Sequence, residues 1–377
     1  MANRETIAAT RAAGRGRGSG RRKYLILFGV LALVAIGAVA VAATSDPKQV
    51  ATPLDVHHLP VGPAAPSLTA ATGWINTPPL PPAKLQGKVV LYDFWTYSCV
   101  NCVRAIPHVR SWYDRYRQDG LVVVGVHSPE FDFEKDAGNV QAAVKRLDVD
   151  YPVALDADMS IWDAFNNQYW PADYIADRTG HLRAATVGEG SYTETENVIR
   201  ALLGVAPSAP RAGSVNEGKV GKPPTAAEDV TPETYLGLQR GIAGAQPGPV
   251  TYPSAPSTDL GRPSLVGPWY GDSEDVTSTA PGAAIVIKYH AREANLVLAS
   301  AAAGDAPVDL RITLDGKPLP PTYRTVDTKV DADGNTYVHV QSSDLYRLVL
   351  GPAIETHLLR LTAESGGVQA FAFTFSS

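Results

Sequence analysis

Two cysteines stand three positions apart, directly after an apolar run, in the stretch DFWTYSCVNC at residues 93–102, and the 377 residues contain no other cysteine. A structural zinc site needs four ligands, and covalent haem attachment needs a histidine after the second cysteine, where Val103 stands. A structural disulfide closing so short a loop constrains the unfolded chain by only about 2 kcal/mol. The pattern therefore favours a reactive thiol pair, with a static disulfide as the alternative.

The pair lies where a strand is followed by a helix. Residues 88–95 are a continuous apolar run suited to a central strand, and residues 102–118 carry apolar residues at helical spacing, broken by Pro107. Cys99 would occupy the first exposed turn of that helix, where free N–H groups and the helix dipole favour a thiolate. Cys102, one turn further on, would attack a mixed disulfide formed at Cys99. Both features predict a redox couple.

Strands and helices alternate around the pair. Parallel strands come first and an antiparallel hairpin comes last, an order that predicts one α/β domain over residues 73–204. Further strands are expected at 120–128, 172–177 and 181–188, and helices at 139–147, 160–167 and 195–203.

The C-terminal half has a different composition and follows a Pro/Gly/Ala-rich linker at residues 205–228. After a short helix expected at 231–241, short alternating strands predict an antiparallel sandwich or jelly roll over residues 229–377. Asp315-Gly316 is a hairpin-turn signal. The strands are expected at 283–291, 294–300, 309–319, 336–341, 345–351, 357–363 and 369–375, and Trp269, Tyr270 and Tyr289 would either stack on a sugar or fill the core.

The N-terminal region carries seven Arg or Lys and one Glu before Tyr24, and residues 24–43 are twenty residues without a charge. This pattern predicts a basic cytoplasmic tail at 1–23, a transmembrane anchor at 24–43 and a stalk at 44–72. A cleaved signal peptide is the alternative. Everything after the anchor would lie outside the cell membrane, and its acidic balance argues against nucleic-acid binding.

Residues 73–204 resemble the thioredoxin superfamily, and more narrowly the membrane-tethered TlpA/DipZ-type redoxins, in GWINTPPL, GKVVLYDFWTYSCVNC, GVHSPEF, FNNQYWPADYIAD and GEGSY. The C-terminal half resembles the domain attached to DipZ-type redoxins in TPETYLG, YHAREANLVL, LDGKPL and FAFTF, a domain likened to carbohydrate-binding modules. The resemblance implies a thioredoxin fold and a thiol:disulfide oxidoreductase that acts on protein disulfides, on the reducing side, without metal or cofactor.

The resemblance also implies roles for individual residues. Cys99 matches the nucleophilic cysteine and Cys102 the resolving one. Asp93 falls where thioredoxins keep a buried acid beside the resolving thiol. Pro107 matches the helix-kinking proline, and Pro171 the cis proline that faces the disulfide.

Some roles also have a basis in the chemistry of the side chains. A buried Asp93 would have a raised pKa and would take the proton of Cys102. Pro171 leaves neighbouring backbone groups free to pair with an extended peptide, and Trp95 and Trp170 are expected to contact the substrate. Glu130 is either an active-site acid or an exposed turn carboxylate.

Other residues have weaker roles. Glu189 lies in a glycine-flanked turn, His108 is expected to pack or face water, and His127 would lie in the core or at the rim of the site.

Two competing functions remain open. A thiol peroxidase is suggested by Thr96, three residues before Cys99, although Tyr92 stands where peroxiredoxins have a proline. A non-catalytic binding protein would use the C-terminal domain for a carbohydrate or a protein. A reductase outside the membrane would need a separate transmembrane electron donor, because one span and two cysteines provide no relay.

Overall fold

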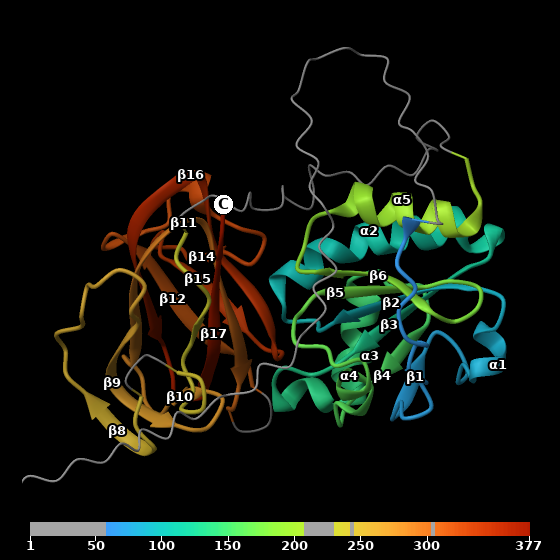
Figure 1. Cartoon of the computed structure of the whole chain (residues 1–377). Helices are drawn as coiled ribbons and strands as arrows, with labels where there is room; N and C mark the ends of the chain where they lie inside the picture. Colours follow the sequence, from blue (N-terminus) through green and yellow to red (C-terminus); the bar gives the residue numbers. More distant parts are fainter. Residues whose placement is uncertain (1–57, 207–229, 242–244, 303–305) are drawn as a thin grey trace, which may run out of the picture. The chain divides into compact units, whose positions relative to one another are not determined.

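The computed structural model describes residues 58–206, 230–241, 245–302 and 306–377 (Figure 1). The expected cytoplasmic tail, the anchor at 24–43 and nearly all of the linker lie outside these ranges. Within them, no helix is both long and apolar enough to span a membrane.

The N-terminal half, residues 58–206, is built on a six-stranded sheet. Three central strands run parallel, and the strands at both edges run antiparallel to their neighbours. The predicted order of parallel strands followed by a hairpin is confirmed, while two three-residue strands, at 73–75 and 153–155, were not predicted. The strands in spatial order are β1 (Gly73–Ile75), β4 (Val153–Leu155), β3 (Leu121–His127), β2 (Val89–Trp95), β5 (Ala172–Ala176) and β6 (Leu182–Val187).

Helices cover both faces of this sheet. On one face α2, α3 and α5 bury apolar side chains against β2 and β3. On the other face α4 does the same, and the partly buried Leu85 of α1 packs against the same cluster. In Figure 1, α2 and α5 lie side by side, and an ion pair between Arg115 and Glu196 joins them. The helices are α1 (Pro82–Leu85), α2 (Val100–Tyr116), α3 (Ala137–Arg146), α4 (Ser160–Ala164) and α5 (Tyr192–Leu203), with 3-10 turns η2 (Arg117–Asp119) and η3 (Asp132–Lys135).

Helix α2 begins two residues earlier than expected and continues as far as Tyr116, with Pro107 inside it. A proline lacks the N–H of one helical hydrogen bond, but packing of the buried face keeps the remaining turns in place. Val109 and Trp112, two and five residues beyond the proline, are 1% exposed. The helix is therefore held by the core at the point where its own hydrogen bonding is weakest.

The C-terminal half, residues 230–377, is all β, as predicted. The eleven strands formed by its described residues pair antiparallel, and the sheet curls back so that β9 pairs with both β10 and β11 around one apolar core. The strands are β7 (Thr234–Tyr235), β8 (Gly248–Tyr252), β9 (Ser264–Gly271), β10 (Val276–Ser278), β11 (Ala284–Ser300), β12 (Val308–Leu314), β13 (Lys317–Pro318), β14 (Lys329–Val330), β15 (Thr336–Val340), β16 (Asp344–Ala363) and β17 (Val368–Ser376), with the 3-10 turn η5 (Pro321–Tyr323).

Several predicted boundaries in this half are wrong. The strands expected at 283–291 and 294–300 form one strand, β11, whose polar centre is an irregularity in the pairing between Ala291 and Glu293. The strands expected at 345–351 and 357–363 likewise form one strand, β16, and the expected helix at 231–241 contains strand β7 instead. The turn at Asp315-Gly316 is confirmed, with φ values of 51° and 79°.

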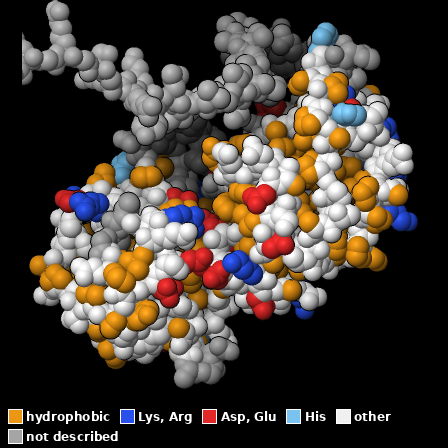
Figure 2. Space-filling view, turned by 60° about the horizontal axis from the view of Figure 1, so that its bottom comes forward, with side chains coloured by type: hydrophobic (Ala, Val, Ile, Leu, Met, Phe, Trp, Pro, Cys, Tyr) orange, Lys and Arg blue, Asp and Glu red, His pale blue; other side chains and the backbone are white. Residues whose placement is uncertain are grey.

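The two halves share a small apolar cluster. Phe131 and Phe133 pack on Phe371 of β17, with ring centroids 5.1 and 4.9 Å apart. Val297 and Ala299 of β11 belong to the same buried cluster. The face drawn in Figure 2 shows acidic and basic side chains mixed among apolar ones.

Candidate active site

The two thiols occupy the first turn of α2 but differ in exposure. Cys99 is the N-cap residue, partly exposed, and its Sγ accepts the backbone N–H of Cys102 at 3.3 Å. Cys102 is completely buried, and both cysteines are free thiols. An attacking reagent therefore reaches Cys99 first, and Cys102 is accessible only from within the protein.

Asp93 lies in β2 behind the thiols and is 1% exposed. Burial raises the pKa of Asp93 to about 7. The Tyr151 hydroxyl, which donates a hydrogen bond to Oδ2 of Asp93 at 3.3 Å, acts in the opposite direction and lowers this pKa. Burial also raises the pKa of Cys102 well above its ordinary value, with contributions from Cys99 and from the charge of Asp93. A proton acceptor that titrates near neutral pH thus acts on the buried thiol.

Asp173 was not predicted as a site residue. It lies directly opposite Asp93 in the antiparallel pair of β2 and β5. Burial, and then the charge of Asp93, raises the pKa of Asp173 well above its ordinary value. The sequence signal was present, because Asp173 follows Pro171 by two residues, but the strand register is needed to connect it with Asp93.

Glu134 is a second residue that sequence reasoning missed. It is 1% exposed and accepts hydrogen bonds from the Ser98 hydroxyl at 2.7 Å and from the backbone N–H groups of Glu130 and Phe131 at 2.7 and 3.0 Å. Burial raises the pKa of Glu134 to about 7. It connects the residue before Cys99 to the loop after β3, and so holds the entrance to the site in shape.

The peptide bond between Trp170 and Pro171 is cis, and Pro171 is buried. The Trp170 indole donates to the Ser128 carbonyl at 3.0 Å and packs on Trp162, with ring centroids 4.1 Å apart. Trp170 thus has a fixed position and lines the cavity that contains Cys99.

The expectation that Trp95 contacts the substrate is wrong. Trp95 is completely buried in the core cluster that contains Cys102. Its indole occupies the space beside Gly125, where a Cβ would come within 2.8 Å of the ring nitrogen. Strand alternation explains the error, since Trp95 and Asp93 point to the same covered face of the sheet.

The cavity at Cys99 measures about 450 Å³ and has walls from both halves of the chain. Its lining includes Trp170 and Glu130 from the N-terminal half and Glu233 and Arg240 from the C-terminal half. Glu233 is exposed at this rim, and its Oε2 accepts a hydrogen bond from the Tyr235 hydroxyl at 3.1 Å. The contribution of the C-terminal half was not predicted from the sequence.

Glu130 is not an exposed turn carboxylate. Its side chain is 10% exposed and accepts hydrogen bonds at 2.7 Å from both Arg240 and the Tyr235 hydroxyl. It therefore lies at the rim of the cavity, where its charge is already paired.

The histidines lie in packed surroundings. His127 is 1% exposed beside Trp95, and burial lowers the pKa of His127 to about 3, which keeps the ring neutral and places it in the core rather than at the rim. His108 stacks on Tyr192 with ring centroids 3.6 Å apart, so its packing role is confirmed.

Glu189 pairs with Arg104 of α2 at 2.6 Å, and both side chains are under one tenth exposed. Arg104 also lies 3.7 Å from Glu293 and donates to the Ser376 hydroxyl at 3.3 Å. The active-site helix is thereby tied to two strands of the C-terminal half.

Replacing Arg104 by methionine is expected to lower the free energy of unfolding by about 3–5 kcal/mol, because it leaves the buried Glu189 carboxylate without a partner. Urea unfolding provides the measurement. The control is Arg115→Met, which breaks the more exposed pair with Glu196 and should cost about 1 kcal/mol or less. Equal losses in the two variants would contradict this interpretation.

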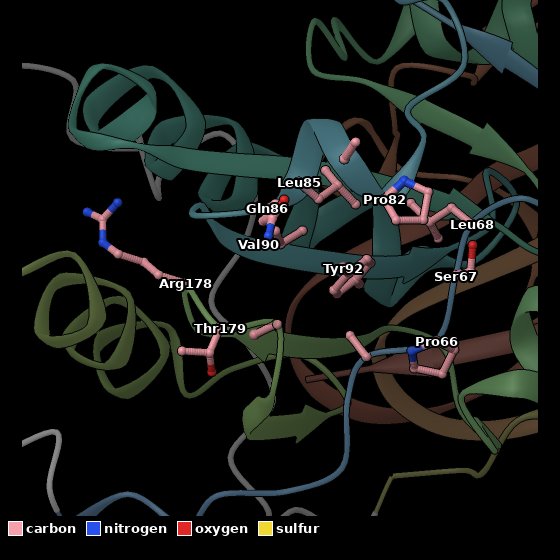
Figure 3. A pocket seen from close by; sticks show the side chains of 14 residues that line it. Pro66, Ser67, Leu68, Pro82, Leu85, Gln86, Val90, Tyr92, Arg178 and Thr179 are labelled. Atoms are coloured by element: carbon pink, nitrogen blue, oxygen red, sulfur yellow. The ribbon is translucent and has the colours of Figure 1, made fainter.

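A second cavity, also about 450 Å³, lies on the other face of the sheet (Figure 3). It is lined by Leu68, Leu85, Val90 and Tyr92, with Arg178 among its polar residues. Neither thiol reaches it, because Tyr92 and Cys102 belong to core clusters on opposite faces.

The proposed sugar platform in the C-terminal half is wrong. Trp269 and Tyr289 are 1% and 0% exposed within the core, and only Tyr270, at 44%, is exposed. The alternative of core filling is confirmed for the two buried rings.

Comparison with known proteins gives the family. Residues 231–376 match the family described as Thioredoxin like C-terminal domain, and residues 61–185 match the AhpC/TSA family. Protein DipZ of Mycobacterium tuberculosis is 37% identical over 322 residues, which cover 82% of this chain and 42% of DipZ. Thiol-disulfide oxidoreductase YkuV of Bacillus subtilis is 34% identical over 138 residues, covering 37% of this chain and 93% of YkuV.

The chain thus spans less than half the length of DipZ, while it covers nearly all of YkuV. The match to DipZ extends through both halves of the chain, and the C-terminal match adds the accompanying domain. The chain belongs to the thioredoxin-like redoxins of the DipZ/TlpA type, within the thiol:disulfide oxidoreductases.

Proposed function

We propose that this chain is an extracytoplasmic thiol:disulfide oxidoreductase that reduces disulfide bonds of proteins. The observation that carries the proposal is the arrangement of a partly exposed Cys99, a buried Cys102 one turn later and a buried Asp93 that titrates near neutral pH. This set provides an accessible nucleophile, an internal second thiol and a proton acceptor, which dithiol–disulfide exchange requires.

The reaction proceeds in two exchanges. The Cys99 thiolate attacks one sulfur of the substrate disulfide, and the other substrate sulfur leaves as a thiolate. Cys102 then gives its proton to Asp93 and attacks Cys99, which releases the second substrate thiolate and closes the Cys99–Cys102 disulfide. The proton on Asp93 passes to the departing thiolate or to solvent. Two electrons thus move from the dithiol to the substrate, and solvent supplies the remaining proton needed to give two substrate thiols.

The substrate would enter the cavity beside Trp170 and Pro171. A cavity of about 450 Å³ with a fixed indole on one side suits a cysteine in an extended or protruding segment. Glu130 lines the wall of this cavity. Its carboxylate is already paired with Arg240 and Tyr235, so its role there is to shape the wall and not to transfer a proton.

The location outside the cell membrane rests on the charge pattern of residues 1–43. Reduction in that compartment would require a transmembrane electron donor, because the chain has only two cysteines. If residues 24–43 anchor the chain, alkaline carbonate extraction leaves the protein in the membrane fraction; recovery in the soluble fraction would contradict the anchor.

Thiol peroxidase activity is the second candidate, supported by the match to the AhpC/TSA family. Thr96, which suggested it, is completely buried with its hydroxyl 3.4 Å from a His127 ring nitrogen. Because Thr96 is completely buried, its hydroxyl is not exposed to a reagent that approaches Cys99, which favours disulfide exchange.

The redox potential of the Cys99–Cys102 pair tests the proposal. We expect a value near or below about −270 mV, the range of thioredoxin, when the protein is equilibrated with dithiothreitol or glutathione and the thiols are counted by alkylation. A value near about −120 mV would make the protein an oxidant. Oxidation of the pair faster by hydrogen peroxide than by a peptide disulfide would favour the peroxidase instead.

A further inference from the structure

Asp93 and Asp173 are register partners in the antiparallel pair of β2 and β5. Side chains of direct cross-strand partners project from the same face, with Cβ atoms about 4.5–5.5 Å apart. Leu91 and Ile175, two residues away on each strand, belong to the core cluster that contains Cys102. By the two-residue alternation of a strand, both aspartates face the side of the sheet on which Cys102 lies.

Within the described part of the chain, no positive charge acts to stabilise the ionised form of Asp93 or Asp173. Burial raises the pKa of both, the charge of Asp93 raises that of Asp173 further, and no nearby cation contributes to lowering either within the described part of the chain. Two carboxylates at such a separation, with no cation beside them, do not both ionise near neutral pH.

One oxygen atom of the Asp173 carboxyl group lacks a hydrogen-bond partner in the part of the chain that the structure describes. The Oδ1 of Asp173 is buried and has no hydrogen-bond donor among the described residues. Buried polar atoms without a partner are rare in folded proteins and call for an explanation. A protonated Asp173 would pair with the Asp93 carboxylate opposite it, which satisfies both groups.

The groups that face the pair are neutral hydroxyls and the thiols. Tyr151 donates to Asp93, the two cysteines lie at the start of α2, and the Tyr192 phenol of α5 lies near Asp173. The more distant Arg104 and Glu189 form a pair whose opposite charges act against each other.

We infer that Asp173 keeps a proton and donates it in a hydrogen bond to Asp93, so that the pair carries one negative charge behind Cys102. Asp173 is then a positioning residue that acts on the thiol through Asp93. This inference rests on the proposed function for its role in turnover. When Cys102 attacks the mixed disulfide, its S–H bond breaks, the proton moves to Asp93, and the pair holds two protons until one is released.

The test uses 5,5′-dithiobis(2-nitrobenzoate), which forms a mixed disulfide with Cys99 and releases a coloured thiolate. Attack by Cys102 releases a second coloured thiolate, so stopped-flow absorbance follows the Cys102 step without any protein substrate. The readout is the pH at which this step reaches half its maximal rate, compared in wild type, Asp173→Asn and Asp173→Leu.

We expect Asp173→Leu to raise that pH by about one unit, because the Asp93 carboxylate loses its hydrogen-bond donor. Asp173→Asn retains a donor and should rescue most of the shift. Asp163→Leu, an exposed position on α4, is the control for nonspecific effects. An unchanged midpoint in Asp173→Leu, or equal shifts in the Leu and Asn variants, would overturn the inference.

A titration of the carboxyl groups keeps the inference testable if Asp173→Leu fails to fold. Infrared difference spectra between wild type and Asp173→Asn should contain a protonated carboxyl that persists above pH 8. In Asp93→Asn, Asp173 should ionise at a pH lower by at least about one unit, because the charge of Asp93 is gone. Absence of that carboxyl overturns the inference, whereas failure of the wild type to reduce any disulfide would overturn only the proposed function.

Discussion

Cys99→Ser is expected to abolish disulfide reduction. Serine is not a nucleophile toward sulfur at neutral pH, and Cys102 is completely buried, so no second thiol takes over the first attack. Turnover of a peptide disulfide, followed by the release of its thiols in the presence of a chemical reductant, gives the measurement. Turnover at the wild-type rate would show that the chemistry lies elsewhere in the chain.

Cys102→Ser is the matched variant for this prediction. The first exchange remains possible at Cys99, but the internal attack does not, so mixed disulfides with the substrate should accumulate. Nonreducing electrophoresis and mass spectrometry detect these adducts directly. If neither variant forms adducts and both still bind substrate, the pair is a static disulfide and not a redox couple.

Asp93→Asn is expected to slow the internal attack by Cys102 by about 10²–10⁴-fold at neutral pH, the usual range for a positioned general base. The amide of asparagine cannot take the proton of Cys102, whose pKa burial holds well above its ordinary value. The measurement is the release of the second chromophore from the nitrobenzoate adduct at Cys99. A rate within a factor of two of wild type would exclude Asp93 as the proton acceptor.

The same substitution is expected to stabilise the reduced protein at alkaline pH. The pKa of Asp93 rises from 3.8 to about 7 on folding, so the folded state binds the proton more tightly than the unfolded state. The full stability is present below about pH 4 and is lost progressively as the pH rises to about 7, by at most about 4 kcal/mol. Asparagine does not ionise and avoids this loss.

Urea unfolding at pH 4 and pH 8 checks the stability prediction. The free energy of unfolding of Asp93→Asn should exceed that of wild type at pH 8, and the difference should shrink toward pH 4. The exposed Asp163→Asn serves as the control, with no expected pH-dependent gain. A difference that is the same at both pH values would mean that the carboxyl is not buried in its neutral form.

Local sequence pattern was enough to predict the core of the site. The apolar run of β2, the helical spacing of α2 and the two cysteines between them predicted Cys99 at the exposed start of a helix and Cys102 one turn further on, as the structure has them. The complete burial of Cys102 was not predicted. The burial of Asp93 was also expected, because its strand is apolar on both sides. These features depend on neighbours within a few residues, where periodicity is informative.

The features that sequence reasoning missed depend on contacts between distant segments. Asp173 becomes part of the site only through the register of β5 against β2, and the cavity wall at Arg240 only through packing of the C-terminal half. Tryptophan is common in binding surfaces, but strand alternation directs the Trp95 side chain into the core. The long strand β11 was divided in two because its central polar residues, at an irregularity in the pairing, look like a turn in the sequence.

Because the two cysteines differ in exposure, thiol labelling of the native protein reports how often the active site opens. In the folded, reduced protein an alkylating reagent meets the partly exposed Cys99, while Cys102 is 0% exposed. Modification of the second thiol therefore requires the first turn of α2 to open. The ratio of doubly to singly labelled molecules, read by mass spectrometry, reports how often the site opens, with no engineered probe.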